Sequence, residues 1–232
     1  ASKTFTPIIL VLAVISILYG AFLAIGAPDI KRLIAYTSIS HFGFITLGIF
    51  AFTSQGQSGA SLYMVNHGFS TAALFLISGY LISRRGSRFI EDFGGVNKVA
   101  PLMAGTFLLA GLSSLALPGM SSFVSEFLVL TGTFTRYPAE AIIATTGIIF
   151  AALYILLMYQ RTMTGEPSEA VTNTVTEINK RELVAIAPVL AVIIALGFVP
   201  QALLNVINPT VDKTMQVVAV ADPKPAFEGT NS

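Results

Sequence analysis

The sequence predicts an all-α membrane protein with six transmembrane spans, one of which is discontinuous. Composition is the first reason: 54% of the 232 residues are hydrophobic and 11% are charged. Soluble domains carry about 25% charged residues, so this chain lacks the charge to cover a surface that faces water. Apolar stretches of about 20 residues, the length that crosses a bilayer as a helix, recur along the chain. One apolar stretch is much longer and contains the pair Pro118-Gly119.

Five spans have ordinary lengths and are expected at residues 5–27, 30–52, 62–83, 139–161 and 183–208. Residues 5–27 fit a full span better than a signal peptide, which would have a basic start and a shorter apolar core. The chain does not begin with Met, and we expect it to be one piece of a longer protein. The transmembrane domain then covers residues 1–211, and residues 212–232 are expected to form an extended tail.

The remaining span, residues 101–134, is too long for one straight crossing. As a continuous helix it would be about 50 Å long, against a hydrocarbon core of about 30 Å. Pro118 lacks a backbone donor and disfavours helical geometry in the residue before it, so we expect a break near residues 117–119. Backbone groups freed at membrane depth must be satisfied by protein or water, and the break therefore predicts a buried, hydrated interior.

The distribution of basic residues predicts the orientation. Six spans place successive connections on alternating sides of the membrane. One side carries Lys31, Arg32, Arg84, Arg85, Arg88, Lys98, Arg161, Lys180 and Arg181, and the other carries Lys3, Arg136, Lys213 and Lys224. The more basic side is expected to face the cytoplasm.

Composition also excludes several function classes. The net charge of +1 gives no electrostatic footprint for nucleic acid. The chain has no cysteine, which excludes disulfides, thiolate metal sites and cysteine-held iron–sulfur clusters within it. Its two histidines, His41 and His67, are far apart in sequence and show no metal-ligand spacing.

Glu126 is the only carboxylate in the apolar stretch between residues 99 and 135. A charged side chain at mid-bilayer costs roughly 2.5–3.5 kcal/mol on insertion scales, and such residues usually serve ion or proton pathways. No Lys or Arg lies on the same half of its span, so its partner must come from another helix, from water or from another subunit. The sequence therefore points to proton or cation movement through a membrane.

His67 lies in a polar stripe of its span. Tyr63, His67, Ser70 and Thr71 fall roughly on one helical face, which is expected to turn toward the protein interior. Histidine exchanges protons near neutral pH, so His67 is a candidate relay residue. The alternative is a packing histidine that is bonded to a neighbouring helix.

Two further candidates lie near the start of the second span. His41 shares a face with Ser38 and could belong to a hydrated line, although we favour the simpler interpretation that these groups bond to helix carbonyls. Lys31 would by default anchor the helix at the membrane interface. A relay role for Lys31 is the alternative, because it is next to the line of Ser and His side chains.

Residues 29–41 (DIKRLIAYTSISH), 66–70 (NHGFS) and 117–127 (LPGMSSFVSEF) together resemble the antiporter-like subunits of respiratory complex I. The resemblance implies a fourteen-span fold built from two inverted five-helix repeats, each with a broken helix. The six spans here are similar to the ninth to fourteenth, and the first repeat would lie upstream. Glu126 matches the charged residue of the second broken helix, which is usually Lys in the L and N types and Glu in the M type. His67 matches a histidine of the central axis, and Lys31 matches a Lys-Arg pair with a less settled role.

The resemblance implies proton translocation coupled to quinone reduction by NADH, through a half-channel that includes Glu126 and His67. FMN, iron–sulfur clusters and quinone would belong to other subunits, with no cofactor in this chain. The implied partners are the neighbouring membrane subunits and the lipid bilayer, most simply the bacterial inner membrane, with no nucleic acid. The alternative within this scaffold is a subunit of a sodium/proton antiporter or membrane-bound hydrogenase. A different class is a purely structural membrane scaffold, which replacement of Glu126 would distinguish.

Overall fold

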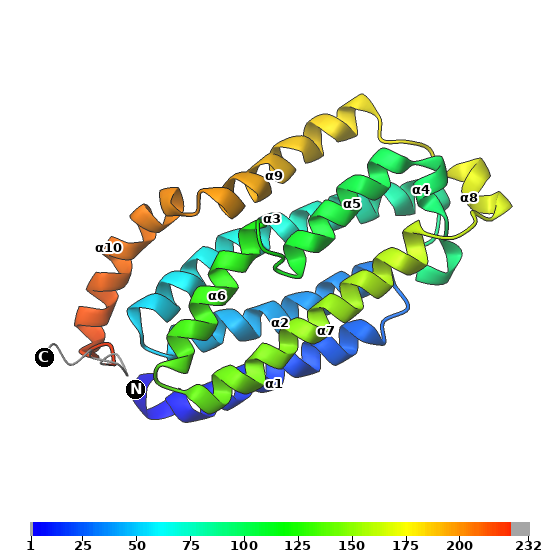
Figure 1. The fold of residues 1–232 in the computed structure, drawn as a ribbon. Coiled ribbons are helices and arrows are strands. Elements are labelled where there is room, and N and C mark those ends of the chain that lie inside the picture. Colours follow the sequence, from blue (N-terminus) through cyan, green and yellow to red (C-terminus); the bar gives the residue numbers. More distant parts are fainter. Residues whose placement is uncertain (1, 224–232) are drawn as a thin grey trace, which may run out of the picture.

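The computed structural model describes residues 2–223, which form an elongated bundle of helices with no strand element (Figure 1). The long elements are α1 (Ser2–Ile25), α2 (Ile30–Phe50), α3 (Ser54–Arg85), α5 (Pro101–Ser114), α6 (Ser121–Phe134), α7 (Pro138–Met163), α9 (Lys180–Phe198) and α10 (Gln201–Val218). The connections at one end contain η1 (Ile90–Asp92), α4 (Val96–Val99) and α8 (Glu169–Thr174). By length and composition, α1, α2, α3, α7 and α9 can each cross a membrane. The predicted all-α membrane fold is confirmed.

The long fourth span is discontinuous, as predicted. Helix α5 ends at Ser114 and α6 begins at Ser121, and the backbone between them makes tight turns. Gly119 has φ +92°, a left-handed conformation that residues with a Cβ rarely adopt, and Ala116 has φ +56°. The break therefore contains both residues of the predicted pair: Pro118 disfavours helical geometry at Leu117, and Gly119 adopts the left-handed conformation in the turn before α6 begins.

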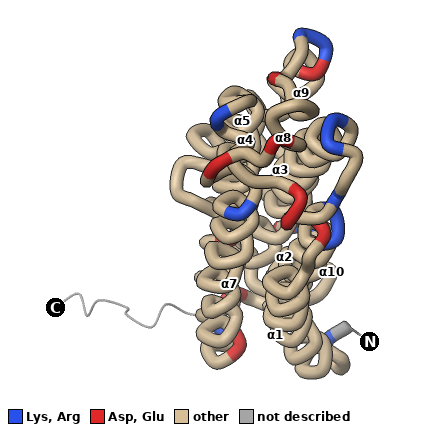
Figure 2. The backbone as a smooth tube through the Cα atoms, turned by 90° about the vertical axis from the view of Figure 1, so that its right-hand side faces the viewer, with Lys and Arg blue, Asp and Glu red and all other residues tan. Residues whose placement is uncertain are grey.

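The two ends of the bundle are held by different polar contacts. At one end, ion pairs join Arg84 to Glu182, Arg88 to Asp29 and Lys98 to Glu166. Figure 2 looks onto this end, where charged residues gather around α4, α8 and the start of α9. At the opposite end, Lys3 and Arg136 donate to the carbonyl oxygens of Ala219 and Ala221. The connections thus alternate between ends as expected, while the cytoplasmic assignment of the more charged end stays a prediction.

Helix α3 begins at Ser54, earlier than the expected start at residue 62. The Thr53 hydroxyl accepts a hydrogen bond from the Gly56 amide and caps the helix. The extra turns pack against α6 through glycine: a Cβ on Gly59 would lie 2.7 Å from the backbone nitrogen of Val129. The segment 54–61 is polar and resembles a loop in sequence, but it is helical because its glycine lets it pack closely against α6.

The expectation of one span at residues 183–208 is wrong. The chain forms two helices, and α9 ends at Phe198 because Pro200 disfavours helical geometry at Val199, whose φ and ψ are −128° and 57°. The expected extended tail is also wrong at its start, since α10 continues to Val218. Apolar residues continue at helical spacing through this segment, where Val211 and Met215 are buried. Residues 224–232 of the expected tail lie outside the described residues.

A polar layer divides the interior. One apolar cluster includes Ile34 of α2 and Ala73 of α3, and a second includes Phe44 of α2 and Ala60 of α3. Between the two clusters, the same helices bury polar side chains: Thr37, Ser40 and His41 from α2, and Asn66, His67 and Ser70 from α3. The break between α5 and α6 brings further hydroxyl groups to this layer.

Candidate functional site

Glu126 lies in the polar layer, in the second turn of α6 after the break. The residue is only 4% exposed, and its carboxyl group interacts with the hydroxyl of Tyr63 on α3. Tyr154 of α7 is close enough to interact electrostatically with the carboxyl group. The partner predicted to come from another helix is therefore Tyr63, among the residues that the structure describes.

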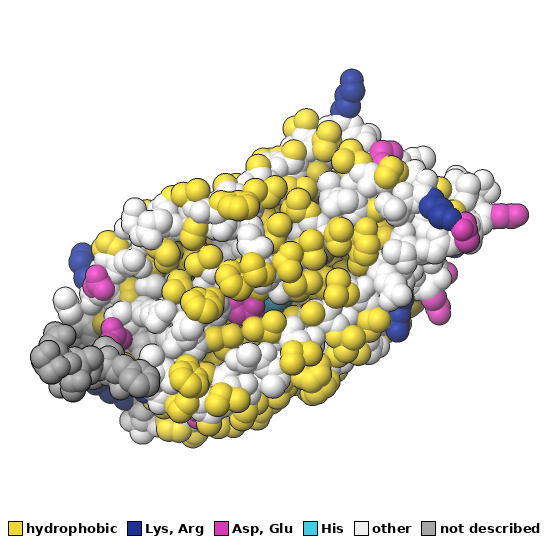
Figure 3. All heavy atoms as spheres, in the orientation of Figure 1, with side chains coloured by type: hydrophobic (Ala, Val, Ile, Leu, Met, Phe, Trp, Pro, Cys, Tyr) yellow, Lys and Arg dark blue, Asp and Glu magenta, His cyan; other side chains and the backbone are white. Residues whose placement is uncertain are grey.

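Glu126 also lines a cavity of about 290 Å³ between the break and α6–α7, whose other walls include Pro118, Phe127 and Ile148. In Figure 3 an acidic side chain is visible at the bottom of a hollow in an otherwise apolar face, with a histidine beside it. The carboxyl group is thus buried within the bundle yet borders an open space.

His41 connects α2 to both α3 and the break. Its Nδ1 atom lies 2.7 Å from the Tyr63 hydroxyl, and its Nε2 atom lies 3.4 Å from the Ser114 hydroxyl. The sequence favoured bonding to helix carbonyls for this region, and Thr37 does bond in that way to Ile34. His41 itself instead bonds to side chains of two other helices.

His67 continues the line toward the charged end of the bundle. Its ring centroid lies 5.0 Å from that of His41, and the Thr71 hydroxyl lies 3.2 Å from its Nδ1 atom. Its ring also meets the ring of Phe42 edge-on at 5.4 Å. The sequence prediction that His67 faces the interior agrees with its burial, since the residue is 6% exposed.

Asn66 fixes the start of α6 against α3. Its Nδ2 atom donates to the carbonyl oxygen of Ser121 at 2.6 Å and to the Ser125 hydroxyl at 3.3 Å. Within the described part of the chain, the Asn66 Oδ1, the Ser122 hydroxyl and the Tyr154 hydroxyl are buried without a hydrogen-bond partner. Buried polar groups are normally satisfied by protein or ordered water, so these atoms mark where water would bind in the layer.

The structure does not bring Lys31 to this cluster. Lys31 is exposed in the first turn of α2, where its backbone amide donates to the cap residue Asp29. It precedes His41 by ten residues, or about 15 Å along the helix axis. Its exposed position suits the default role of an interfacial anchor, and its relay role stays a prediction.

Sequence reasoning did not single out Tyr63, Asn66, Ser114 or Tyr154 as site residues. Tyr63 was only a member of the polar stripe, although its hydroxyl meets both His41 and Glu126. Tyr154 is the one polar side chain in the apolar run 148–158 of α7, and that isolation is the signal that could have identified it. Among the described residues, no group of three potential ligands could hold a metal ion.

Comparisons with known proteins identify the family of this chain. The model of the family described as "NADH:quinone oxidoreductase/Mrp antiporter, TM" matches residues 1–153, which include every histidine and glutamate of the polar layer. The chain belongs to this family. It is a multi-pass membrane protein, and its resemblance to the antiporter-like subunits is confirmed.

The curated relatives described here share one name, that of a subunit of NADH-quinone oxidoreductase. The chain is 52% identical to NADH-quinone oxidoreductase subunit M of Mycobacterium tuberculosis, over 97% of this chain and 40% of that protein. It is 40% identical to the protein of the same name from Rickettsia prowazekii, over 93% of this chain and 44% of that protein. The chain therefore spans less than half the length of these relatives.

Two solved structures share the fold. Respiratory complex I from Thermus thermophilus contains a chain that matches with a TM-score of 0.89 and 30% identity, over 94% of this chain and 46% of that chain. A membrane-bound sulfane sulfur reductase, an archaeal respiratory membrane complex, matches with a TM-score of 0.79 and 25% identity, over 84% of this chain and 32% of that chain.

Proposed function

We propose that this chain contributes a proton-transfer half-channel to the membrane arm of a proton-translocating NADH-quinone oxidoreductase. The observation that carries the proposal is the buried line of proton-exchanging groups from Thr71 through His67, His41 and Tyr63 to Glu126. Because Tyr63 and Thr71 are eight residues apart on α3, the line covers about 12 Å of the membrane depth.

Tyr63 is the step that joins the histidines to the carboxylate. A proton on Nδ1 of His41 can be donated to the Tyr63 oxygen, which lies 2.7 Å away, while the Tyr63 hydroxyl proton passes to Glu126. Two bonds to hydrogen break and two form, and the tyrosine is neutral before and after the step. The hydroxyl thus moves a proton between two helices without carrying a charge itself.

The transfer between His67 and His41 requires an intermediary. Ring centroids 5.0 Å apart place the imidazoles in contact, but no hydrogen bond joins their nitrogen atoms. A water molecule or rotation of one ring would complete the path, and the buried hydroxyl of Ser114 beside His41 provides a further donor and acceptor. The expected direction is from the more charged end toward Glu126 and then outward.

The names of the relatives support the surrounding assembly. Proteins named subunit M belong to NADH-quinone oxidoreductase, so we propose that other membrane subunits of such a complex are the partners. FMN, iron–sulfur clusters and quinone would be held by those other subunits. The bacterial inner membrane is the proposed location, with the end that carries Arg84 and Lys98 in the cytoplasm.

Sodium dependence tests this function against the antiporter alternative. Membrane vesicles that contain the assembled complex are energised with NADH, and proton uptake is followed with a pH-sensitive dye in sodium-free and sodium-containing buffer. The proposal predicts equal uptake in both buffers, and mass spectrometry of the purified complex should identify subunits that oxidise NADH. Uptake that requires sodium, or a complex without such subunits, would favour the alternative.

A further inference from the structure

Helix α9 and the residues that precede it contact the start of α5, the first half of the discontinuous span, and the break that follows α5. At the start of α5, the Glu177 carboxylate accepts hydrogen bonds from the backbone amides of Leu102 at 2.8 Å and Met103 at 2.9 Å. The first amides of a helix lack partners within the helix, and a carboxylate there also complements the helix dipole. Glu177 therefore fixes the segment before α9 to the beginning of α5.

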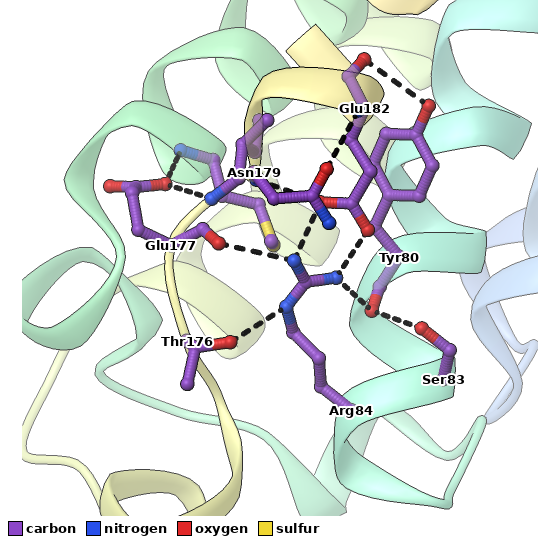
Figure 4. Close-up of polar contacts among 9 residues, drawn as sticks. Tyr80, Ser83, Arg84, Thr176, Glu177, Asn179 and Glu182 are labelled. Carbon is purple, nitrogen blue, oxygen red and sulfur yellow. Dashed lines mark hydrogen bonds and ion pairs between the residues drawn. The ribbon is translucent and has the colours of Figure 1, made fainter.

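Arg84 holds the same segment to α3 (Figure 4). Its two terminal nitrogens donate to the two carboxylate oxygens of Glu182 at 2.8 and 2.6 Å, and one of them also donates to the Glu177 carbonyl at 3.1 Å. The side chains of Arg84 and Glu182 are only 11% and 16% exposed. Glu182 in turn forms a capping box with Asn179 at the start of α9. The beginning of α9 is thus held in a fixed position.

The far end of α9 contacts the break. A Cβ atom on Gly197 would lie 2.2 Å from the carbonyl oxygen of Gly119 and 2.9 Å from the carbonyl carbon of Met120. Real Cβ atoms do not approach backbone atoms this closely, so glycine is required for α9 to lie against the break. One Cα hydrogen of Gly197 then points at the Gly119 carbonyl, a weak but favourable contact.

The position of the break determines where Glu126 lies. Glu126 follows Ser121, the first residue of α6, by five positions, or about 7.5 Å along the helix axis. On the other side of the break, Asn66 binds the Ser121 carbonyl. The first turn of α6 is therefore held between α3 and α9, and a displacement of that turn would shift the Glu126 carboxyl relative to Tyr63.

We propose that α9 is a brace that sets the geometry of the helix break, and that Gly197 and Glu177 are positioning residues for proton transfer through Glu126. This inference rests on the proposed function. Because α9 is fixed at its start by Arg84 and Glu177, an added Cβ at position 197 cannot be absorbed by sliding the helix. The first turn of α6 must move instead.

The test is Gly197→Ala, with Gly105→Ala as the matched control. Both positions lie inside helices, where alanine is intrinsically favoured by about 1 kcal/mol, but a Cβ on Gly105 would meet no atom within 4 Å. Proton uptake per NADH oxidised is measured across a pH series, on vesicles with equal amounts of assembled complex. Because small misplacements of catalytic groups are costly, we expect Gly197→Ala to lower this ratio by about twofold or more. We also expect it to shift the pH profile, while Gly105→Ala leaves both unchanged.

A merely structural role for Gly197 would reduce the amount of assembled complex and leave the ratio and pH profile unchanged, which would overturn the proposal. If Gly197→Ala does not assemble, Glu177→Gln decides the matter, because Gln can accept only one of the two amide hydrogen bonds. A lowered ratio in Glu177→Gln supports the brace, and an unchanged ratio overturns it. Glu126→Gln is measured in parallel: full pumping there removes the proposed function, whereas impaired pumping there with normal Gly197→Ala removes the brace alone.

Discussion

The Nδ1 atom of His41 and the hydroxyl oxygen of Tyr63 lie 2.7 Å apart, although 22 residues separate them in the chain. Tyr63 also interacts with Glu126, so one hydroxyl group lies between an imidazole of α2 and a carboxyl group of α6. Three helices thus meet at a single atom that can donate to one neighbour while it accepts from another. This arrangement gives the proposed path a defined order.

Tyr63→Phe should impair proton pumping while the complex remains assembled. The substitution removes one hydroxyl and keeps the ring that packs in the apolar cluster with Phe44. Proton uptake in NADH-energised vesicles should fall by roughly a hundredfold, the lower end of what a positioned proton-transfer group contributes. Tyr19→Phe is the control, because Tyr19 is 58% exposed on α1. Equal pumping by both variants would contradict the role of Tyr63.

His41→Gln should impair pumping more strongly than His67→Ala. His41 makes two side-chain hydrogen bonds in the layer, to Tyr63 and Ser114, and in the proposed path it is the group that bonds directly to Tyr63. His67 is near Thr71, and removal of its ring leaves space that water can occupy and so partly replace it. Initial rates of proton uptake at matched complex content give the comparison. A larger loss in His67→Ala would require a path that bypasses His41.

Arg84→Ala should loosen the segment before α9 in the assembled complex. It removes the mostly buried charged hydrogen bonds to Glu182 and leaves that carboxylate without its cation, at a local cost of about 2 kcal/mol. Amide hydrogen exchange of residues 176–182, measured by mass spectrometry, should accelerate correspondingly. Lys98→Ala is the control, because its pair with Glu166 has side chains 52% and 85% exposed and contributes less than about 1 kcal/mol. Similar exchange in both variants would contradict a special role for the Arg84 network.

The length of the span and its proline predicted the break between α5 and α6, but the similar break between α9 and α10 was missed. The pair Pro118-Gly119 lies in a span that is too long, so both length and chemistry indicated an interruption. Pro200 ends α9 by the same restriction on its preceding residue, yet the span around it had an ordinary length and gave no second signal. The start of α3 at Ser54 was missed because its packing glycines acquire meaning only when α6 is known to lie against them.

The sequence predicted which residues belong to the site, but not which of their side chains bond to one another. The cost of a buried carboxylate identified Glu126, and the polar stripe of α3 identified the face that carries His67. The bond between His41 and Tyr63 depends on the relative depth of two helices, which periodicity within each helix does not specify. Lys31 is next to the line of Ser and His side chains in the sequence, yet its side chain is exposed and does not enter the polar layer.

Glu126→Gln gives the most direct measurement of the central claim. Gln nearly preserves the shape of Glu126 and its capacity to accept a hydrogen bond from Tyr63, but it cannot exchange a proton in this role. Proton uptake is measured in vesicles energised with NADH, with assembly of the complex verified in the same membranes. The account predicts an assembled complex with strongly impaired pumping, and partial activity in Glu126→Asp. Full pumping by an assembled Glu126→Gln complex would contradict it and favour a structural scaffold.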